Sequence, residues 1–194
     1  MAGLVRGQFI SLGELRDRAL TDRDELWQTA RSVDREAKLY LHWTAGRYGQ
    51  FYDDYHINID ADGSVYITAD NLAEIKAHTW RRNTGAIGIA LACCAGATSN
   101  SLGDEPPTDI QIECLAQVVA VLCTCMDIPL NGAHVMTHAE AANLDDYGPD
   151  TTWERWDLWF LKDGDQPGSG GDIIRGKASW YRDGELNESR VKGL

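Results

Sequence analysis

The stretch from Ala86 to Cys94 constrains the fold most, because every residue in it is apolar or glycine. A short run of this kind, flanked by polar and glycine residues, predicts a central strand that is covered on both faces. A second run, Lys38–Gly46, predicts a buried strand of about five residues that delivers His42 and then breaks into a loop. Strands buried in this way need helices beside them, so we expect an α/β protein.

Helix and hairpin signals surround these two strands. A capping-box pattern opens residues 11–19 and an acidic first turn opens residues 21–37, so two consecutive helices are expected there. Residues 108–126 show a third helical pattern. Residues 55–68 alternate polar and apolar side chains around a glycine-containing turn, which predicts a β-hairpin.

The length of 194 residues favours a single domain. We expect a mixed, mostly buried β-sheet flanked by helices, with the functional site in a cleft at the sheet edge. The domain is assigned to residues 1–165, including the N-terminal helices. Residues 166–171 have the composition of a linker, and residues 172–194 are expected to be a tail that is partly packed or flexible.

Composition narrows the function classes. The net charge of −12 argues against a nucleic-acid surface, which needs clustered lysine and arginine. The first 20 residues carry several charges and no apolar core, so we expect no secretion signal and synthesis in the cytoplasm. No apolar run is long enough for a membrane span. The five cysteines lie in apolar stretches, which favours reduced thiols over a disulfide frame.

Two histidines and one acid provide the clearest candidate site. His42 lies in the first buried strand, and the strand-like run 133–140 contains His138. Asp157 follows downstream. Two histidines and a carboxylate on separate elements form the ligand set of a catalytic zinc, in which the fourth position is left for water. The sequence therefore predicts one Zn²⁺ ion held by these three residues.

Seven short segments between residues 38 and 161 occur in a characteristic order: His42-Trp-Thr, Tyr55-His56, Asp62-Gly-Ser-Val-Tyr66, His78, Asn83-Thr-Gly-Ala-Ile-Gly-Ile89, Thr137-His-Ala-Glu140 and Arg155-Trp-Asp157. Together they resemble the zinc-dependent N-acetylmuramoyl-L-alanine amidases. These enzymes share a fold with the peptidoglycan recognition proteins and include phage endolysins. Each segment is weak alone, whereas their number and order make the resemblance fairly specific.

The resemblance implies a reaction and a catalytic set. His42, His138 and Asp157 would bind zinc, and the enzyme would hydrolyse the amide between N-acetylmuramic acid and L-alanine in peptidoglycan or a muropeptide. Arg155 occupies the place of a basic residue two positions before the third ligand, where it would hold the developing oxyanion. Tyr55 corresponds to a tyrosine that contributes to catalysis in endolysin-type members.

The resemblance also suggests contacts with the substrate. His78 fits a residue lining the cleft as well as it fits a plain loop histidine. Asn83 is expected to face the substrate. Trp43 and Trp80 are flanked by polar residues and are candidates for stacking on sugar or peptide. His56 should point away from the face of Tyr55, as a packed and hydrogen-bonded histidine.

The identity of the general base stays open. Many bacterial amidases of this family carry a glutamate in the central strand, where this chain has Ala90. The role then falls to Tyr55, to Glu140, or to zinc-bound hydroxide without a strong base. Glu140 would share a strand face with His138, two residues away, although a surface acid fits equally well.

The third ligand has nearer competitors along the chain, namely Asp145, Asp146 and Asp150. We prefer Asp157 because of the Arg-Trp-Asp pattern. Residues two apart diverge by roughly 200° on a helix, so Arg155 and Asp157 predict a loop or first turn, with the last helix starting near Trp156.

Three functions therefore compete. The first is a zinc amidase of the bacterial cell wall, acting after lysis or injection, or in the cytoplasm on muropeptides. The second is a peptidoglycan-binding module that keeps the fold without turnover, an alternative supported by Ala90. The third, a hydrolase using Cys93 or Cys94 with a histidine, is disfavoured because both thiols lie in an apolar run with no sign of activation.

Overall fold

The computed structural model describes residues 3–191, with side chains to residue 184. In chain order its elements are β1 (Leu4–Val5), β2 (Gln8–Phe9), α1 (Leu12–Arg31), β3 (Lys38–Trp43), β4 (Phe51–Tyr52), β5 (Ile57–Ile59), β6 (Val65–Ile67), β7 (Ala86–Leu91), α2 (Asp109–Cys125), β8 (Val135–Thr137), α3 (His138–Leu144) and α4 (Gly170–Val191). The expected α/β class is confirmed.

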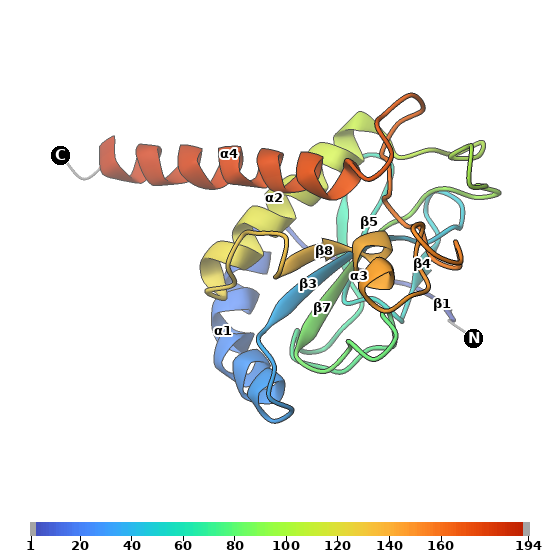
Figure 1. The fold of residues 1–194 in the computed structure, drawn as a ribbon. Coiled ribbons are helices and arrows are strands. Elements are labelled where there is room, and N and C mark those ends of the chain that lie inside the picture. The colour runs from blue at the N-terminus through green and yellow to red at the C-terminus, as the bar shows by residue number, and fades with distance from the viewer. Residues whose placement is uncertain (1–2, 192–194) are drawn as a thin grey trace.

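Six strands form one mixed sheet in the order β2-β6-β5-β7-β3-β8. The pairs β5–β7, β7–β3 and β3–β8 are parallel, whereas β2–β6 and β5–β6 are antiparallel, the latter forming the expected hairpin. A separate two-stranded sheet joins β1 to β4. Helices α1 and α2 lie together on one side of the main sheet and α3 lies on the other (Figure 1).

The two faces of the central strands carry side chains of different size. Leu39 and Leu41 of β3, with Ile87 and Ile89 of β7, belong to the large core that also contains α1 and α2. Successive residues of a strand point to opposite faces. The other face of β7 therefore presents the small residues at positions 86, 88 and 90, and the corresponding face of β3 presents Tyr40 and His42.

Gly88 shows why small residues are needed on this second face. A Cβ atom at Gly88 would lie 2.6 Å from the Cγ atom of His78, closer than real contacts allow. The imidazole ring of His78 therefore packs directly on the backbone of β7. The central strand is buried on both sides, as the sequence predicted, but a helix-rich core covers one side and histidine rings cover the other.

Residues 12–31 form one helix, so the prediction of two helices is wrong. Ser11 caps the helix in the expected box with Glu14. Thr21 does not start a second helix, because its hydroxyl donates a hydrogen bond of 2.9 Å to the carbonyl of Asp17 in the preceding turn. No glycine or proline interrupts the chain at this point.

The helix ends at Arg31 rather than near Ala37. Asp34 adopts a positive φ of 56°, and the amide of Arg35 donates a hydrogen bond to the carbonyl of Ala30. A left-handed residue of this kind commonly ends a helix and turns the chain away. The turn leads directly into β3.

Helix α4 packs along α2 and then extends past the rest of the domain (Figure 1). Its first residues fit closely against α3, since a Cβ atom at Gly171 would lie 2.4 Å from the Glu140 carboxylate. Arg175 binds that carboxylate through two hydrogen bonds of 2.8 and 2.9 Å and also donates to the carbonyl of Val135. One arginine thus joins α4, α3 and β8.

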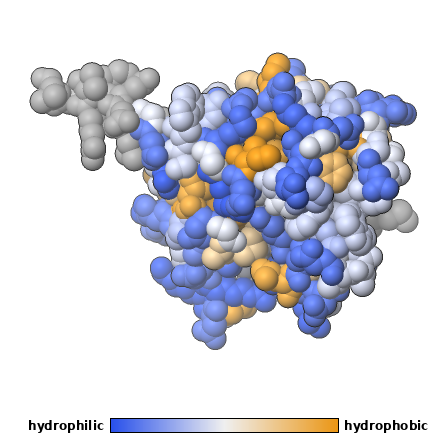
Figure 2. Space-filling view, turned by 45° about the horizontal axis from the view of Figure 1, so that its top comes forward, coloured by the Kyte–Doolittle hydropathy of each residue, from blue (hydrophilic) through white to orange (hydrophobic). Residues whose placement is uncertain are grey.

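Hydrophilic residues cover most of the face drawn in Figure 2, and hydrophobic residues appear there in small separate groups. This distribution agrees with the strongly acidic composition of the chain. Within the described part of the chain, no helix is both long and apolar enough to cross a membrane.

Replacing Arg175 by methionine should lower the free energy of unfolding by about 2 kcal/mol, because Glu140 would lose its charged hydrogen-bond partner in a partly buried position. Urea-induced unfolding measures the change. The matched control is Arg182→Met on the same helix, whose ion pair with Asp183 is more exposed and should contribute little. Equal destabilisation by both variants would contradict the linking role of Arg175.

Candidate metal centre

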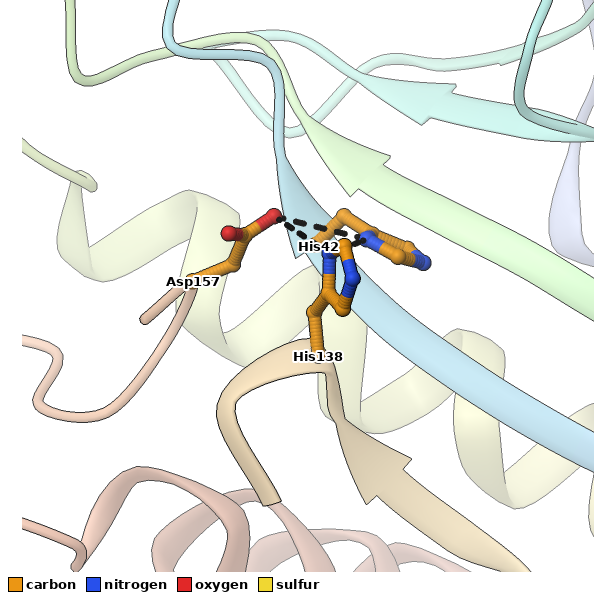
Figure 3. Close-up of side chains that lie close together, drawn as sticks. All are labelled: His42, His138 and Asp157. Carbon is orange, nitrogen blue, oxygen red and sulfur yellow. Dashed lines mark hydrogen bonds and ion pairs between the residues drawn. The ribbon is translucent and has the colours of Figure 1, made fainter. Parts of the chain in front are cut away.

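Three side chains from separate segments point toward one another at the edge of the sheet (Figure 3). His42 lies near the carboxyl end of β3, and His138 follows the last residue of the neighbouring strand β8. Parallel strands that pair side by side end at the same edge of a sheet, which brings the two histidines together. Asp157 reaches them from the loop between α3 and α4.

The three facing atoms form a nearly equilateral triangle. The Nδ1 atoms of His42 and His138 are 3.1 Å apart, and the Oδ2 atom of Asp157 lies 3.4 Å from the first and 3.2 Å from the second. Ligands at 2.0–2.1 Å from a tetrahedral zinc stand about 3.3–3.4 Å from each other. The donor atoms and their separations therefore fit the predicted zinc site, and all three residues are buried.

His138 is positioned by a helix start rather than by a strand. The strand β8 ends at Thr137, which caps α3 in a capping box with Glu140. The expectation that His138 and Glu140 share a strand face is therefore wrong. Instead of facing the triangle, the Glu140 carboxylate accepts hydrogen bonds from the Thr137 amide and from Arg175. Both partners hold the Glu140 carboxylate in place, so this residue has a structural role.

Asp157 lies in an irregular loop, as the Arg-Trp-Asp spacing predicted. The further expectation of a helix starting near Trp156 is wrong, because residues 153–161 contain only turns and bends. Two contacts hold the loop: the amide of Ala139 donates to the carbonyl of Asp157, and the ring of Trp156 packs edge-on against Trp43. The following residue, Leu158, has a positive φ of 56°.

The nearer acids do not join the triangle. Asp145 is bound by two hydrogen bonds from the guanidinium of Arg82, and Asp150 accepts one from the side chain of Asn143. Among the described residues, the triangle is the one group of histidine, cysteine or acidic side chains close enough to share a metal ion. The choice of Asp157 over Asp145, Asp146 and Asp150 agrees with this geometry.

Burial determines the protonation state of His42, whereas neighbouring charges determine that of Asp157. Burial lowers the pKa of His42 to about 4, so its imidazole is neutral near pH 7. Burial alone would raise the pKa of Asp157, but His138 and His42 outweigh it and hold that pKa well below its ordinary value. A neutral imidazole and an ionised carboxylate are the forms that bind a metal.

The second ring nitrogen of each histidine lies close to a hydroxyl group. The Nε2 atom of His42 lies 3.4 Å from the hydroxyl of Thr79, and that of His138 lies 3.4 Å from the hydroxyl of Tyr147. Such partners orient metal-binding histidines and fix their tautomer. Thr79 and Tyr147 were not predicted from the sequence, because neither belongs to a recognisable motif. The only sequence signal was the position of Thr79 beside His78.

A cavity of about 650 Å³ opens beside His138, and we call it the metal-site cavity. Its walls come from residues 77–83 and 145–155, which include His78, Trp80 and Asn83. Arg155 lines the same cavity and is exposed, with its guanidinium hydrogen-bonded to the carbonyl of Glu154. Three of the four residues expected to contact the substrate therefore line the metal-site cavity. The residue expected to stabilise the oxyanion lines it as well.

Tyr55 packs against His42, with ring centroids 5.0 Å apart. Its hydroxyl lies 3.5 Å from the carbonyl oxygen of Trp43. Burial, followed by the charge of Asp157, raises the pKa of Tyr55 well above its ordinary value. The phenol is therefore protonated at neutral pH and can donate a hydrogen bond.

The fourth expected substrate contact, Trp43, lies in the core. It follows His42 in β3 and so points to the opposite face, where it is 4% exposed. Trp80, by contrast, is 54% exposed and carries the guanidinium of Arg81 4.1 Å above its ring. The polar residues flanking Trp43 in sequence gave no indication of this orientation.

His78 and Asn83 form one local unit. The side-chain oxygen of Asn83 accepts hydrogen bonds from the amides of His78 and Thr79, which closes the loop. The Nδ1 atom of His78 pairs with the Thr79 hydroxyl at 3.0 Å, while its Nε2 atom is buried and has no protein partner among the described residues. The residue as a whole lines the metal-site cavity.

His56 is the packed and hydrogen-bonded histidine that the sequence predicted. Its Nε2 atom donates to the carbonyl of Glu74, and its Nδ1 atom accepts from the amide of Gly88. These two bonds fix the neutral form, because a second ring proton would face the Gly88 amide. Burial lowers the pKa of His56 to about 4, in agreement with this geometry.

Fold and site together define an α/β domain with a candidate metal site, the triangle of His42, His138 and Asp157, at the edge of a mixed sheet. The family model described as N-acetylmuramoyl-L-alanine amidase matches residues 22–153, more than half of the chain. The chain belongs to this family. The matched range contains His42 and His138 and ends before Asp157.

Solved structures of endolysins and of an N-acetylmuramoyl-L-alanine amidase are similar at low identity. The Ph2119 endolysin from Thermus scotoductus bacteriophage Ph2119 shares 20% identity over 54% of this chain and 71% of that chain, with a TM-score of 0.42. The amidase LysCS from Clostridium intestinale shares 20% identity over 60% and 78%, with a TM-score of 0.40. LysC from the same organism shares 20% over 60% and 79%, with a TM-score of 0.41. No curated protein sequence matches the chain.

Loss of a residue that only orients a metal ligand weakens metal binding roughly 10–100-fold. Replacing Asp157 by asparagine should weaken zinc binding by more than this, because a charged ligand is removed. Competition with a chromogenic chelator measures the affinity. Asp146→Asn is the matched control, since Asp146 lies in the same connection between α3 and α4 and outside the triangle. Equal zinc affinity of the Asp157 variant and the control would contradict the ligand assignment.

Acidification from pH 7 to pH 5 should cost about 2 kcal/mol of folding free energy through His56 alone, because the unfolded residue binds a proton near pH 6.5 and the folded one near pH 4. This contribution is complete above about pH 6.5 and is lost as the pH falls toward 4. Urea unfolding of the wild type and of His56→Gln at both values isolates it. The variant should be less stable at pH 7 but lose less on acidification; equal losses would contradict the neutral assignment.

Proposed function

We propose that this chain is a zinc-dependent amidase that hydrolyses the bond between N-acetylmuramic acid and L-alanine in bacterial peptidoglycan. The observation that carries the proposal is the buried triangle of His42, His138 and Asp157, whose donor atoms have the chemistry and spacing of a zinc site. Membership of the amidase family supports the bond that is cut.

The three residues would hold one zinc ion, with the imidazoles neutral and the carboxylate ionised. When bound, such an ion supplies Lewis acidity, which lowers the pKa of a coordinated water from 15.7 to about 7 and polarises a carbonyl group. Thr79 and Tyr147 would keep the two imidazole rings in the binding orientation.

Arg155 and Tyr55 are proposed as the groups that act on the substrate. Arg155 lines the metal-site cavity and carries a cationic guanidinium, so it can stabilise the oxygen that becomes negative when the amide carbon is attacked. Tyr55, as a protonated phenol beside His42, would donate a hydrogen bond to the reacting oxygen atoms.

The two positions considered for a carboxylate base do not supply one. Ala90 pairs in register with His42, and it stands where many family members carry glutamate. The Glu140 carboxylate is bound to Arg175. We therefore propose that attack proceeds without a strong protein base. His78, Asn83 and Trp80 would contact the sugar or peptide in the metal-site cavity.

The setting in which the enzyme works is also a proposal. Peptidoglycan lies outside the cytoplasm, so we propose that the enzyme meets it after lysis or injection, or acts on muropeptides in the cytoplasm. A phage or prophage endolysin and a tail-associated lysin fit the first setting, and a muropeptide-recycling enzyme fits the second.

A peptidoglycan-binding module without turnover is the alternative that Ala90 favours. The buried triangle weighs against it, because binding alone does not need three metal ligands. A cysteine hydrolase has less support: Cys93 and Cys94 are fully buried, and burial raises the pKa of the Cys94 thiol far above the range of reactive cysteines.

Digestion of purified peptidoglycan tests the proposal, with new L-alanine amino termini as the readout. Zinc-loaded protein should release them, whereas chelated protein and the Asp157→Asn variant should not. Pull-down on the same peptidoglycan without release would support the binding module instead. Release that survives chelation and stops on thiol alkylation would support the cysteine route.

A further inference from the structure

A second cavity, of about 310 Å³, adjoins the metal-site cavity, and we call it the basic cavity. Asp145 lines both spaces. The other walls of the basic cavity come from residues 35–40, which enter β3, and from residues 81–86, which enter β7. It is therefore built on two neighbouring strands of the sheet, at their amino ends, whereas the triangle lies toward their carboxyl ends.

The charge of this cavity is opposite to that of the whole chain. Four cationic side chains line it together with two acids, in a protein whose net charge is −12. Both acids already have partners, since Asp145 is bound by Arg82 and Glu36 pairs with His134 at 2.8 Å. Within the described part of the chain, Arg35, Lys38 and Arg81 form no ion pair.

The three unpaired cations are held near one another rather than spread over the surface. The Lys38 ammonium group donates to the carbonyl of Ala133 and is partly buried. Burial is the main cause that lowers the pKa of Lys38, and the positive charge of Arg82 adds to it against the opposing charge of Glu36. Crowded like charges destabilise a fold, and an anion bound among them would relieve the repulsion.

The cavity also has fixed walls. Arg82 is held between the two oxygens of Asp145 and the hydroxyl of the buried residue Tyr40. Arg81 has a positive φ of 60°, a strained conformation for a side chain of its size, and its guanidinium stacks on Trp80. Since Trp80 lines the metal-site cavity, this stack joins the two spaces.

We propose that the basic cavity binds an oxyanion, a carboxylate or phosphate group, through Arg35, Lys38 and Arg81. Guanidinium groups bind such anions by paired hydrogen bonds, and the ammonium group adds a point charge. The anion has two possible sources with the same chemistry. It is either a carboxylate of the peptide attached to the bond that is cut, which rests on the proposed function, or a separate small anion.

Titration of inorganic phosphate into the full-length protein at low salt, followed by calorimetry, tests the site directly. The Arg35→Gln/Arg81→Gln variant should bind phosphate about tenfold more weakly, the effect expected from two partly exposed charge contacts. The matched control is Arg6→Gln/Arg16→Gln, which removes the same charge at two exposed positions outside the cavity. Thermal unfolding confirms that both variants fold.

A second measurement separates the two sources. Hydrolysis kinetics would compare muramyl peptides whose peptide carboxylates are free or amidated. If the substrate supplies the anion, the cavity variant raises KM about tenfold for the free carboxylate, with kcat and the amidated substrate unchanged. Phosphate binding that is lost in the variant with no change in KM identifies a separate anion.

Two results would overturn the proposal. One is an equal loss of phosphate affinity in the cavity variant and the control, which would assign the effect to net charge alone. The other is no phosphate binding by the wild type together with no selective change in KM. Because calorimetry needs no turnover, a chain that binds phosphate but does not cut peptidoglycan would refute the proposed function and leave the anion site standing.

Discussion

The parallel pairing of β3 with β8 is the constraint on which the candidate site depends. It places the ends of two neighbouring strands at one edge of the sheet, so His42 and His138 meet although 95 residues separate them in the chain. Backbone hydrogen bonds of the sheet and the capping box of α3 hold both histidines. Asp157 alone depends on a loop, and that loop is held by its contact with Ala139 and by the packing of Trp156 on Trp43.

β7 has one face of large residues and one face of small residues. This division supports the pairing of β3 with β8. Ile87 and Ile89 contribute to the core beneath α1 and α2, whereas Gly88 leaves space for the ring of His78. Burial among these rings keeps His42 and His56 neutral. The same packing that stabilises the fold therefore holds His42 in the protonation state that binds a metal.

Sequence patterns were sufficient where local chemistry decides the structure. The α/β class and the helix near residues 108–126 were predicted, because strand runs and caps are local signals. The triangle of His42, His138 and Asp157 was also predicted, from the ligand types together with the resemblance of their segments to the amidase family. Predictions failed where tertiary context decides. The direction of Trp43 depends on which face of β3 meets the helices, and the partner of Glu140 comes from α4. Thr79 and Tyr147 meet the histidines only in the folded chain.

The proposed activity requires one metal ion bound by nitrogen and oxygen donors, in a chain that also contains five cysteines. X-ray absorption at the zinc edge, recorded on protein loaded with one equivalent of zinc, tests this most directly. The expected spectrum shows two imidazole groups with the remaining ligands oxygen. Sulfur in the coordination shell, or scattering from water alone, would contradict the central claim.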